Sequence, residues 1–455
     1  MGHILIANVV SMIIGLFNSF MLPKFLSIDT YAVVKTYNLY ITYANIFCFG
    51  YNEGMYLKYG GKNIKAIDKE DLSSSLFNFL YLEIAAFLLV FSSAVILNSF
   101  VLCAFAFGMF SFNIITYLKS LYQATGEFSQ YGKSLNYEKL GIFILNVILM
   151  FILKSDNYML YIGVQVLVEA VIGTYLFLSL RKRLELPLHF KMEIFEIKSN
   201  VKNGFVLMIG NFSSSIFVGL DRWFVKILLT SVYFAYYSFA ASIESLINVF
   251  ITPITISLYN TFCKGIDDKQ IKLLKNLIVI WCYAIIGVAF PIKWIVVNYL
   301  SKYQDALDII FILLVAQPFY GIIKGIYVNI FKANKQQNYY MKQMLFMTII
   351  AIVLNCVFFI FSKSIVSIAM ATLITSIIWL LLCEAKSKYQ FSVTEYLSIF
   401  IFTTSFLVYS GFENPLVGLL FYVITCVLTG CLFMRSSLTY MISLVVNKVK
   451  QFYKR

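Results

Sequence analysis

The stretch SIVSIAMATLITSIIWLLLC, residues 364–383, contains twenty residues and no charged side chain. A helix needs about 20 predominantly apolar residues to cross the hydrocarbon core of a bilayer. Residues 364–383 are therefore predicted to form a membrane-spanning helix. The rest of the chain has the same character: of its 455 residues, 60% are hydrophobic and 13% are charged, whereas soluble domains carry about 25% charged residues. The composition predicts an integral membrane protein rather than a soluble enzyme.

Thirteen further apolar segments lie on both sides of this stretch. The segments 140–153 and 396–411 are short, and the segments 36–57 and 203–225 are polar enough to need a face that is protected from lipid. The predicted fold class is all-α and polytopic, with about 14 transmembrane helices. The predicted spans are 3–23, 36–57, 76–98, 101–118, 140–153, 158–180, 203–225, 232–257, 276–297, 306–331, 343–361, 364–383, 396–411 and 415–434.

Lysine and arginine residues gather in alternate loops. Cytoplasmic loops of membrane proteins carry an excess of these residues. With the N-terminus placed in the cytoplasm, the cytoplasmic stretches contain 27 basic residues and the outer loops contain six. We therefore expect both termini to be cytoplasmic. The predicted cytoplasmic stretches are 58–75, 119–139, 181–202, 264–275, 332–342, 384–395 and 435–455.

The longest loop, 181–202, is predicted to be a cytoplasmic linker between two six-helix bundles, 1–180 and 203–383. Two extra transmembrane helices and a cytoplasmic tail follow in 384–455, and the tail 436–455 is expected to form an interfacial helix. An even number of spans in each bundle makes the two bundles a parallel pseudo-repeat around a central cavity, an arrangement common in transporters. An internal similarity at an offset of 202 supports the repeat: Leu5, Ser11, Ile14, Lys24, Leu26, Tyr31 and Ile41 recur as Leu207, Ser213, Ile216, Lys226, Leu228, Tyr233 and Ile243.

The net charge of +14 does not indicate a nucleic-acid partner, because the basic residues sit in short gaps between apolar runs. The eight cysteines form no CxxC pair and lie almost wholly within apolar runs, so we expect small hydrophobic side chains rather than disulfides or metal ligands. His3 and His189 are far apart in the sequence and make no site. The sequence therefore predicts no metal and no cofactor.

Two carboxyl groups lie near the middle of predicted spans. Glu169 is in the sixth span and Glu244 in the eighth. An ionisable group at this depth costs about 2.5–3.5 kcal/mol on insertion scales, so it usually faces a partner or an aqueous cavity. Each glutamate is either a binding site for a coupling proton or cation, or a neutral carboxyl hydrogen-bonded to a neighbouring helix. The sequence leaves both interpretations open.

Four ionisable residues lie in the cytoplasmic third of their spans: Glu53, Glu83, Lys119 and Lys324. At this depth a long side chain can reach the lipid headgroups. We expect this headgroup contact for all four. Lining of a substrate path is the alternative.

Asp221 and Arg222 are adjacent in the outer half of the seventh span. Neighbouring residues on a helix point about 100° apart, because a turn contains 3.6 residues. The two side chains are therefore expected to pair with different helices or to line one cavity. Lys293, near the outer end of the ninth span, is expected at the membrane interface.

Three segments together resemble the bacterial O-antigen and capsule flippases. LPKFLSIDTYAVVKTY (22–37) fits the first outer loop of this family, and FCFGYNEGMYLKYGG (47–61) fits the end of its second helix. GLDRWFVKILLTSVYFAYYSFAAS (219–242) has an Asp-Arg pair, a short outer turn and a YxxYS-like segment. The family belongs to the superfamily that also contains multidrug and toxin extruders and the peptidoglycan-precursor flippase.

The resemblance implies a flippase, not an enzyme, that moves an undecaprenyl-diphosphate-linked oligosaccharide across the bacterial cytoplasmic (inner) membrane for O-antigen or capsule biosynthesis by ion-coupled alternating access. Its partners would be the lipid-linked oligosaccharide, membrane lipid and other polysaccharide assembly proteins. Fixed cations are expected along the route of a diphosphate, since an unpaired anion is costly in a low-dielectric cavity. The candidate substrate-binding residues are Arg222, Lys324, Asp221, Glu53 and Lys58, and the candidate ion-coupling residues are Glu169 and Glu244.

Two other function classes compete with a flippase. A multidrug or toxin extruder of the same superfamily needs an acidic cavity for cations, whereas the charges within the spans of this chain have both signs. A membrane sugar polymerase or ligase typically carries a sizeable outer loop with catalytic side chains. The predicted outer loops here are short, and neither histidine lies in one.

Overall fold

A computed structural model describes residues 2–188, 192–263 and 267–440, and these residues form helices and connecting turns without any strand. Twelve helices among them are long and apolar enough to cross a membrane, and Met12–Phe25 is a shorter apolar helix. The predicted all-α polytopic fold is confirmed. The chain divides into two compact units, Met1–Gly219 (unit 1) and Leu220–Arg455 (unit 2).

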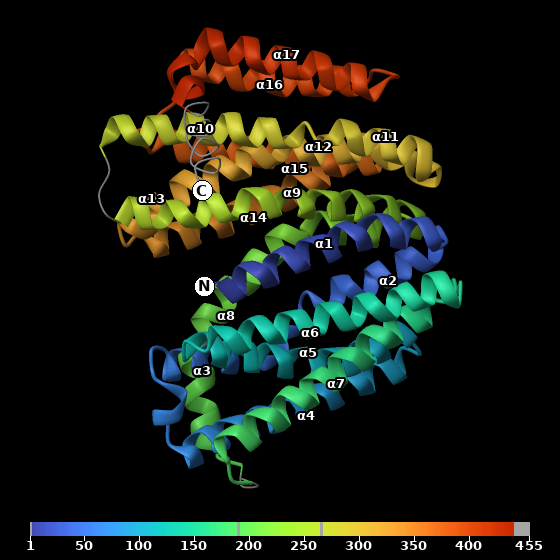
Figure 1. The fold of residues 1–455 in the computed structure, drawn as a ribbon, viewed down its shortest axis with the longest axis vertical. Coiled ribbons are helices and arrows are strands. Elements are labelled where there is room, and N and C mark those ends of the chain that lie inside the picture. The colour runs from blue at the N-terminus through green and yellow to red at the C-terminus, as the bar shows by residue number, and fades with distance from the viewer. Residues whose placement is uncertain (1, 189–191, 264–266, 441–455) are drawn as a thin grey trace, which may run out of the picture. The chain divides into compact units, whose positions relative to one another are not determined.

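Unit 1 is organised around α5 (Phe100–Ala124), against which α2, α4, α6 and α7 pack (Figure 1). α5 is more deeply buried within the structure than α4 or α7. The other elements of unit 1 are α1 (Gly2–Phe25), α2 (Ile28–Ile41), the 3-10 helix η1 (Ala44–Cys48), α3 (Tyr51–Tyr59), the 3-10 turn η2 (Ile64–Ala66), α4 (Lys69–Ile96), α6 (Phe128–Val147) with a π-helical end η3 (Ile148–Ile152), α7 (Tyr158–Leu184) and the first part of α8 (Ile194–Leu228).

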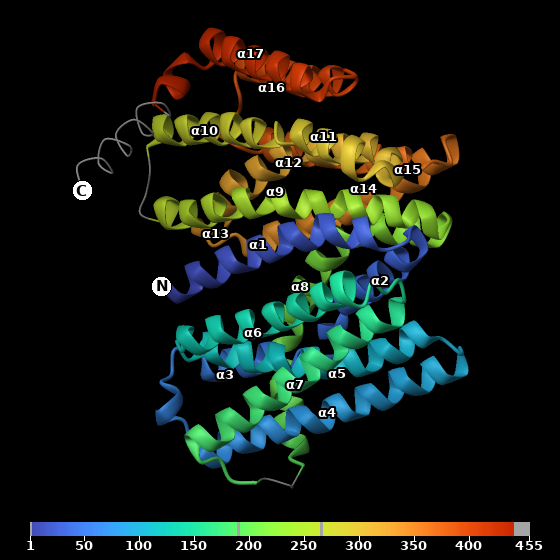
Figure 2. The ribbon, with the colours of Figure 1, turned by 45° about the vertical axis from the view of Figure 1, so that its right-hand side comes forward.

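Unit 2 is organised around α12 (Leu307–Ile322), in which every residue from Ile309 to Ile322 is buried. Helices α9, α10 and α15 pack against it, and α16 and α17 lie side by side as a pair (Figures 1 and 2). The remaining elements are α9 (Ser231–Cys263), α10 (Asp268–Ile286), α11 (Ala289–Tyr299), η4 (Ser301–Ala306), the π-helical turn η5 (Ile323–Tyr327), α13 (Val328–Ala333), α14 (Gln337–Phe361), α15 (Ile365–Ala385), α16 (Val393–Ser410) and α17 (Pro415–Phe433).

Several helices begin where the sequence offers a capping side chain. Asp68, Ser99, Asn157 and Ser364 each accept a hydrogen bond from a backbone N–H of the first helical turn. These bonds satisfy donors that have no partner within the helix. Ser392 and Glu395 complete a reciprocal capping box at the start of α16.

The second predicted span, 36–57, is not one helix. α2 ends at Ile41, η1 follows, and α3 begins only after Phe49 and Gly50, both in the left-handed region (φ 50° and 84°). Gly50 tolerates this backbone because it has no Cβ, and a Cβ there would lie 2.9 Å from the amide nitrogen of Phe205 on α8. Broken helices of this kind are tolerated in membranes only where protein or a cavity surrounds the break.

The described residues of the predicted linker 181–202 are mostly helical. α7 extends to Leu184 and α8 begins at Ile194, so the division between the two units falls within α8. Two described residues of the connecting segment contact α4: the Ser73 hydroxyl donates to the carbonyl oxygen of Pro187 at 2.5 Å, and the Glu193 backbone N–H donates to Asn78 Oδ1 at 2.9 Å. Of the interfacial helix predicted for 436–455, residues 441–455 lie outside the described part of the chain.

Helices α3 and α8 cross in very close contact. A Cβ placed on Gly54 would overlap the backbone of Asn200, and one placed on Gly204 would overlap the backbone of Gly50 and Gly54. Small residues at a crossing let two helix backbones approach, which is a common way to pack helices in membranes. The crossing therefore fixes the position of α3 against α8.

Replacing Gly54 by alanine is expected to destabilise the protein by about 1–3 kcal/mol, because an added methyl group in a tight contact forces the backbone to shift. Gly210 also lies on α8, and among the described residues no atom outside the adjoining turns of α8 lies within 4 Å of the position that a Cβ would take there. Gly210→Ala is therefore the matched control and should be neutral or slightly stabilising. The midpoint of thermal unfolding of the purified protein in detergent measures both. Equal stability of the two variants would show that the crossing is loose.

Candidate functional site

Asp221 connects the end of α8 to the start of α9. Its side chain is buried, and its Oδ2 atom accepts a hydrogen bond from the Tyr237 hydroxyl at 2.8 Å. Its Oδ1 atom accepts one from the Arg222 backbone N–H at 2.7 Å. The two helices meet because only two residues separate Leu228 from Ser231. The carboxylate is thus held in place, while the Arg222 side chain remains partly exposed.

Glu244 lies two turns beyond Tyr237 on α9. The Gln317 side chain of α12 donates a hydrogen bond to Glu244 Oε1 at 2.6 Å. The carboxyl group is within electrostatic range of Asp221, Arg222 and Lys324. We call these six residues the unit 2 cluster: Asp221, Arg222, Tyr237, Glu244, Gln317 and Lys324.

Lys324 lies in the π-helical turn η5, which follows α12. Its side chain is exposed, and its ammonium group lies over the Tyr320 ring, 5.7 Å from the centroid. Single π-helical turns inside helices are rare and frequently mark functional sites. The structure therefore places four of the seven predicted site residues near one another in unit 2: Asp221, Arg222, Glu244 and Lys324.

Glu169 lies in unit 1, on α7, and is 1% exposed. Gln165 donates a hydrogen bond to its Oε1 atom at 3.2 Å, and its Oε2 atom is buried without a hydrogen-bond partner among the described residues. The charges of Lys119 and Glu138, which form an ion pair at 2.5 Å, and the buried Tyr37 hydroxyl lie within electrostatic range. This carboxyl group has no partner of opposite charge in direct contact within the described part of unit 1.

Glu53 lies on α3, just beyond the helix break. Its Oε1 atom accepts hydrogen bonds from Asn45 at 3.0 Å and Asn211 at 3.3 Å. Asn52 in turn donates to Asn45 Oδ1 at 3.2 Å. Polar side chains from η1, α3 and α8 therefore surround Glu53 next to the helix break.

Lys58 is the centre of an ion network at the end of α3. Its ammonium group is 2.5 Å from Asp71 Oδ1 and 2.9 Å from Glu196 Oε1. Burial lowers the pKa of Lys58, but hydrogen bonds to Asp71 and Glu196 outweigh this effect, so the pKa is raised and the charge is retained. Glu196 also accepts hydrogen bonds from Ser74 and Asn78. Lys58 is therefore already paired with two carboxylates, Asp71 and Glu196.

The expectation that Glu83 and Lys119 contact lipid headgroups is wrong. Glu83 is fully buried, accepts a hydrogen bond from Asn113 at 2.9 Å, and shares that amide with the Ala44 carbonyl oxygen. Lys119 is paired with Glu138, and their side chains are only 15% and 13% exposed. Each side chain instead has a hydrogen-bond or ion-pair partner inside the protein, because burying an unpaired polar or charged group is costly.

Two lysines near predicted loops have partners that sequence reasoning missed. Lys275 and Glu384 form an ion pair at 2.9 Å with side chains 2% and 3% exposed. Lys293 donates to the carbonyl oxygens of Ser410 and Phe412 at the end of α16, where a cation is favourable for the helix dipole. Both partners lie more than a hundred residues away in the sequence, so no local pattern indicates them.

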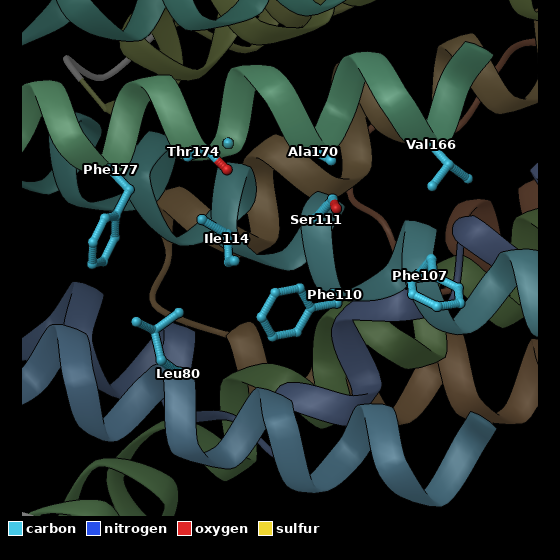
Figure 3. Close-up of a pocket in the computed structure, with 10 residues that line it drawn as sticks. Leu80, Phe107, Phe110, Ser111, Ile114, Val166, Ala170, Thr174 and Phe177 are labelled. Carbon is cyan, nitrogen blue, oxygen red and sulfur yellow. The ribbon is translucent and has the colours of Figure 1, made fainter. Parts of the chain in front are cut away.

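An apolar cavity of about 340 Å³ lies between α4, α5 and α7 of unit 1 (Figure 3). Leu80, Phe107, Phe110 and Phe177 are among its lining residues, and only the Ser111 and Thr174 side chains bring oxygen atoms to it. It therefore offers little to a charged or hydroxyl-rich ligand. Among the described residues no group of three or more His, Cys, Asp or Glu side chains is placed to hold a metal ion.

The comparison with known proteins gives a family match and several fold matches. A family model described as "Polysaccharide biosynthesis protein" matches residues 1–265. The solved structure of the lipid II flippase MurJ in an inward closed conformation is similar, with a TM-score of 0.73, 17% sequence identity, and coverage of 95% of this chain and 98% of that chain. No curated protein sequence matches this chain significantly.

Transporters of a second kind share the fold less closely. An inward-facing multidrug resistance MATE family transporter of the MOP superfamily has a TM-score of 0.54, 11% identity, and coverage of 83% of this chain and 98% of that chain. A MATE structure in complex with MaL6 has a TM-score of 0.53, 11% identity, and coverage of 88% and 95%. At these identities the likeness concerns the fold alone.

Proposed function

The chain belongs to the polysaccharide biosynthesis protein family, and from this we propose that it is a flippase that moves a lipid-linked oligosaccharide across the cytoplasmic membrane. A multi-pass helical fold like that of a lipid II flippase supports this proposal. The substrate we propose is an undecaprenyl-diphosphate-linked repeat unit for O-antigen or capsule. Both termini would be cytoplasmic, and other polysaccharide assembly proteins would supply and receive the substrate.

The unit 2 cluster is the observation that carries the proposal. It combines two cations, Arg222 and Lys324, with two carboxyl groups, Asp221 and Glu244, in helices that are apolar enough to span the membrane. A diphosphate needs fixed positive charge to enter such surroundings, since an unpaired anion in a low-dielectric region is very costly. We assign Arg222 and Lys324 to the diphosphate and Asp221 to the positioning of the end of α8.

Ion coupling follows from the charge balance of the same cluster. With Asp221 and Glu244 both ionised, the two carboxylates balance Arg222 and Lys324. A proton or other cation bound at Glu244 would leave excess positive charge for the diphosphate, and its release would restore the balance and favour release of the substrate. Glu169 is the second proposed coupling group, because its buried carboxyl has no ion-pair partner among the described residues.

Replacing Glu244 or Glu169 by glutamine is expected to lower polysaccharide export by about tenfold or more, equivalent to about 1.4 kcal/mol or more, because a neutral amide cannot bind and release the coupling proton or cation. Export should also lose its dependence on external pH in the Glu244→Gln variant. Glu413→Gln is the matched control, since Glu413 is exposed. Full export in both single variants and in the double variant, at equal protein levels, would remove both glutamates from coupling.

Deletion of the gene tests the function itself. The expected result is loss of a surface polysaccharide together with accumulation of its lipid-linked repeat unit on the cytoplasmic side. A multidrug extruder, which the MATE-like fold also fits, would instead leave the polysaccharide intact and raise sensitivity to cationic drugs.

A further inference from the structure

An open cavity of about 520 Å³ lies in unit 1 between α3 and the first turns of α8. Gly54, Leu57 and Lys58 line it from α3, and the lining residues from α8 are Phe195, Glu196, Ser199, Asn200 and Asn203. The close glycine crossing described above forms its wall, so the two helices that build the cavity are fixed relative to each other. Its size is within the range of about 300–1,000 Å³ typical of small-molecule sites.

The α8 side of this cavity carries the hydrogen-bonding side chains of Ser199, Asn200 and Asn203. Asn200 is 3% exposed and also interacts with the neighbouring Tyr51 hydroxyl, which donates a hydrogen bond to the Ser75 carbonyl oxygen at 2.9 Å. Ser199 and Asn203 also line the cavity and are exposed. Amides and hydroxyls both donate and accept hydrogen bonds, as sugar hydroxyls do.

The cavity lining also contains an aromatic side chain, that of Phe195. Phe195 lines the cavity and is 87% exposed. A sugar ring presents C–H groups on its faces and hydroxyls around its edge. An exposed phenyl ring next to amides and a hydroxyl matches both features, because it covers an apolar face while the polar groups bind the edge.

The charges around the cavity argue against a phosphate. Lys58 is the one basic residue among the described lining residues, and Asp71 and Glu196 both contact its ammonium group. The network of these three side chains carries one positive and two negative charges, so it repels an anion. A ligand rich in hydroxyl groups suffers no such repulsion.

We propose that this cavity binds the saccharide part of the substrate, at a place separate from the unit 2 cluster assigned to the diphosphate. This inference rests on the proposed function and adds to it a sugar-recognition site in unit 1. Phe195 stacks on the sugar, and Asn200, Asn203 and Ser199 bind its hydroxyls. By the predicted topology the cavity opens at the cytoplasmic side, where the sugar is attached to its lipid.

The test uses the full-length protein in detergent and the oligosaccharide released by mild acid from the lipid-linked repeat unit of the source cells. This probe lacks both lipid and phosphate. Isothermal titration should detect binding to the wild-type protein, and the double variant Phe195→Ala/Asn203→Ala should bind about tenfold more weakly or worse. Both residues are exposed, so the fold should survive. Lys198→Ala, an exposed neighbour outside the lining, is the matched control and should bind normally.

Two comparisons separate this inference from the proposed function. Arg222→Ala should bind the released oligosaccharide as the wild type does, and inorganic pyrophosphate should not compete with it. Unchanged binding in the double variant, competition by pyrophosphate, or no binding to the wild type would overturn the saccharide site. Translocation of the intact lipid-linked substrate by the same wild-type preparation would show that the flippase proposal stands even if the saccharide site fails.

Discussion

Replacing Glu384 by alanine is expected to lower the free energy of unfolding by about 3–5 kcal/mol, because it leaves the ammonium group of Lys275 buried without its counter-ion. Both side chains are almost fully buried, at 2% and 3% exposed, and the two groups are 2.9 Å apart. Water cannot replace the lost carboxylate at this depth. The effect should be among the largest of any single substitution in unit 2.

The surroundings of Glu384 make the loss larger than that of one ion pair. Its Oε1 atom also accepts a hydrogen bond from the Tyr327 hydroxyl, and its Oε2 atom accepts bonds from the Phe391 backbone N–H at 2.7 Å and the Tyr396 hydroxyl at 3.3 Å. The Lys275 ammonium lies 3.6 Å from the centroid of the Phe391 ring. The pair therefore connects α10, η5, α15 and the start of α16.

Two variants make this prediction specific. Lys69→Ala removes an exposed ion pair with Glu185, whose side chains are 56% and 81% exposed, and should cost about 0–1 kcal/mol. The double variant Lys275→Met/Glu384→Leu removes both buried charges and should recover much of the stability. Thermal unfolding of the purified proteins in detergent measures all three. A Glu384→Ala variant as stable as the Lys69→Ala variant would contradict this description of the pair.

Alanine at Arg222 or at Lys324 is expected to reduce substrate translocation by about 10–100-fold, because a hydrogen bond between charged groups contributes about 1.5–3 kcal/mol. The physical reason is the diphosphate: each cation is assigned to it in the unit 2 cluster. Arg222→Lys should retain part of the activity. A lysine keeps the charge but loses the planar fork that binds phosphate through two parallel hydrogen bonds.

Lys226→Ala is the control for these cation variants. Lys226 lies one turn beyond Arg222 on α8, and its ammonium group is over the Phe234 ring, 5.1 Å from the centroid. It is outside the unit 2 cluster, so the Lys226→Ala variant should translocate substrate normally. Undiminished translocation by both Arg222→Ala and Lys324→Ala, at matched expression, would exclude these two cations from the substrate path.

The spans can be predicted because a membrane requires a run of apolar residues of known length. The 14 predicted segments coincide with helical parts of the chain, apart from the break within 36–57 and a two-residue turn at 287–288, between α10 and α11, within 276–297. The apolar pattern does not predict the break within 36–57, which lies where α8 approaches Gly50, a contact between residues about 155 positions apart. The glycine itself is the available signal, as glycine often marks a backbone that other residues cannot adopt.

The sequence predicts which candidate site residues lie within spans, but it does not predict which of their side chains contact one another. Their position within apolar runs selects Asp221 and Glu244, and the structure adds Tyr237 and Gln317 as their hydrogen-bond partners. The sequence assigns Lys275 and Glu384 to cytoplasmic loops, because each lies at the edge of an apolar run. These contacts depend on how helices far apart in the sequence pack together, which cannot be predicted from a single sequence.

Translocation of the labelled lipid-linked repeat unit in sealed vesicles that contain the purified protein measures the proposed activity itself. We expect the wild-type protein to bring the saccharide to the opposite side of the membrane, and the Arg222→Ala/Lys324→Ala double variant to leave it in place. Vesicles in which the saccharide stays on its original side, while the same wild-type protein exports a cationic drug, would contradict the proposal of a flippase.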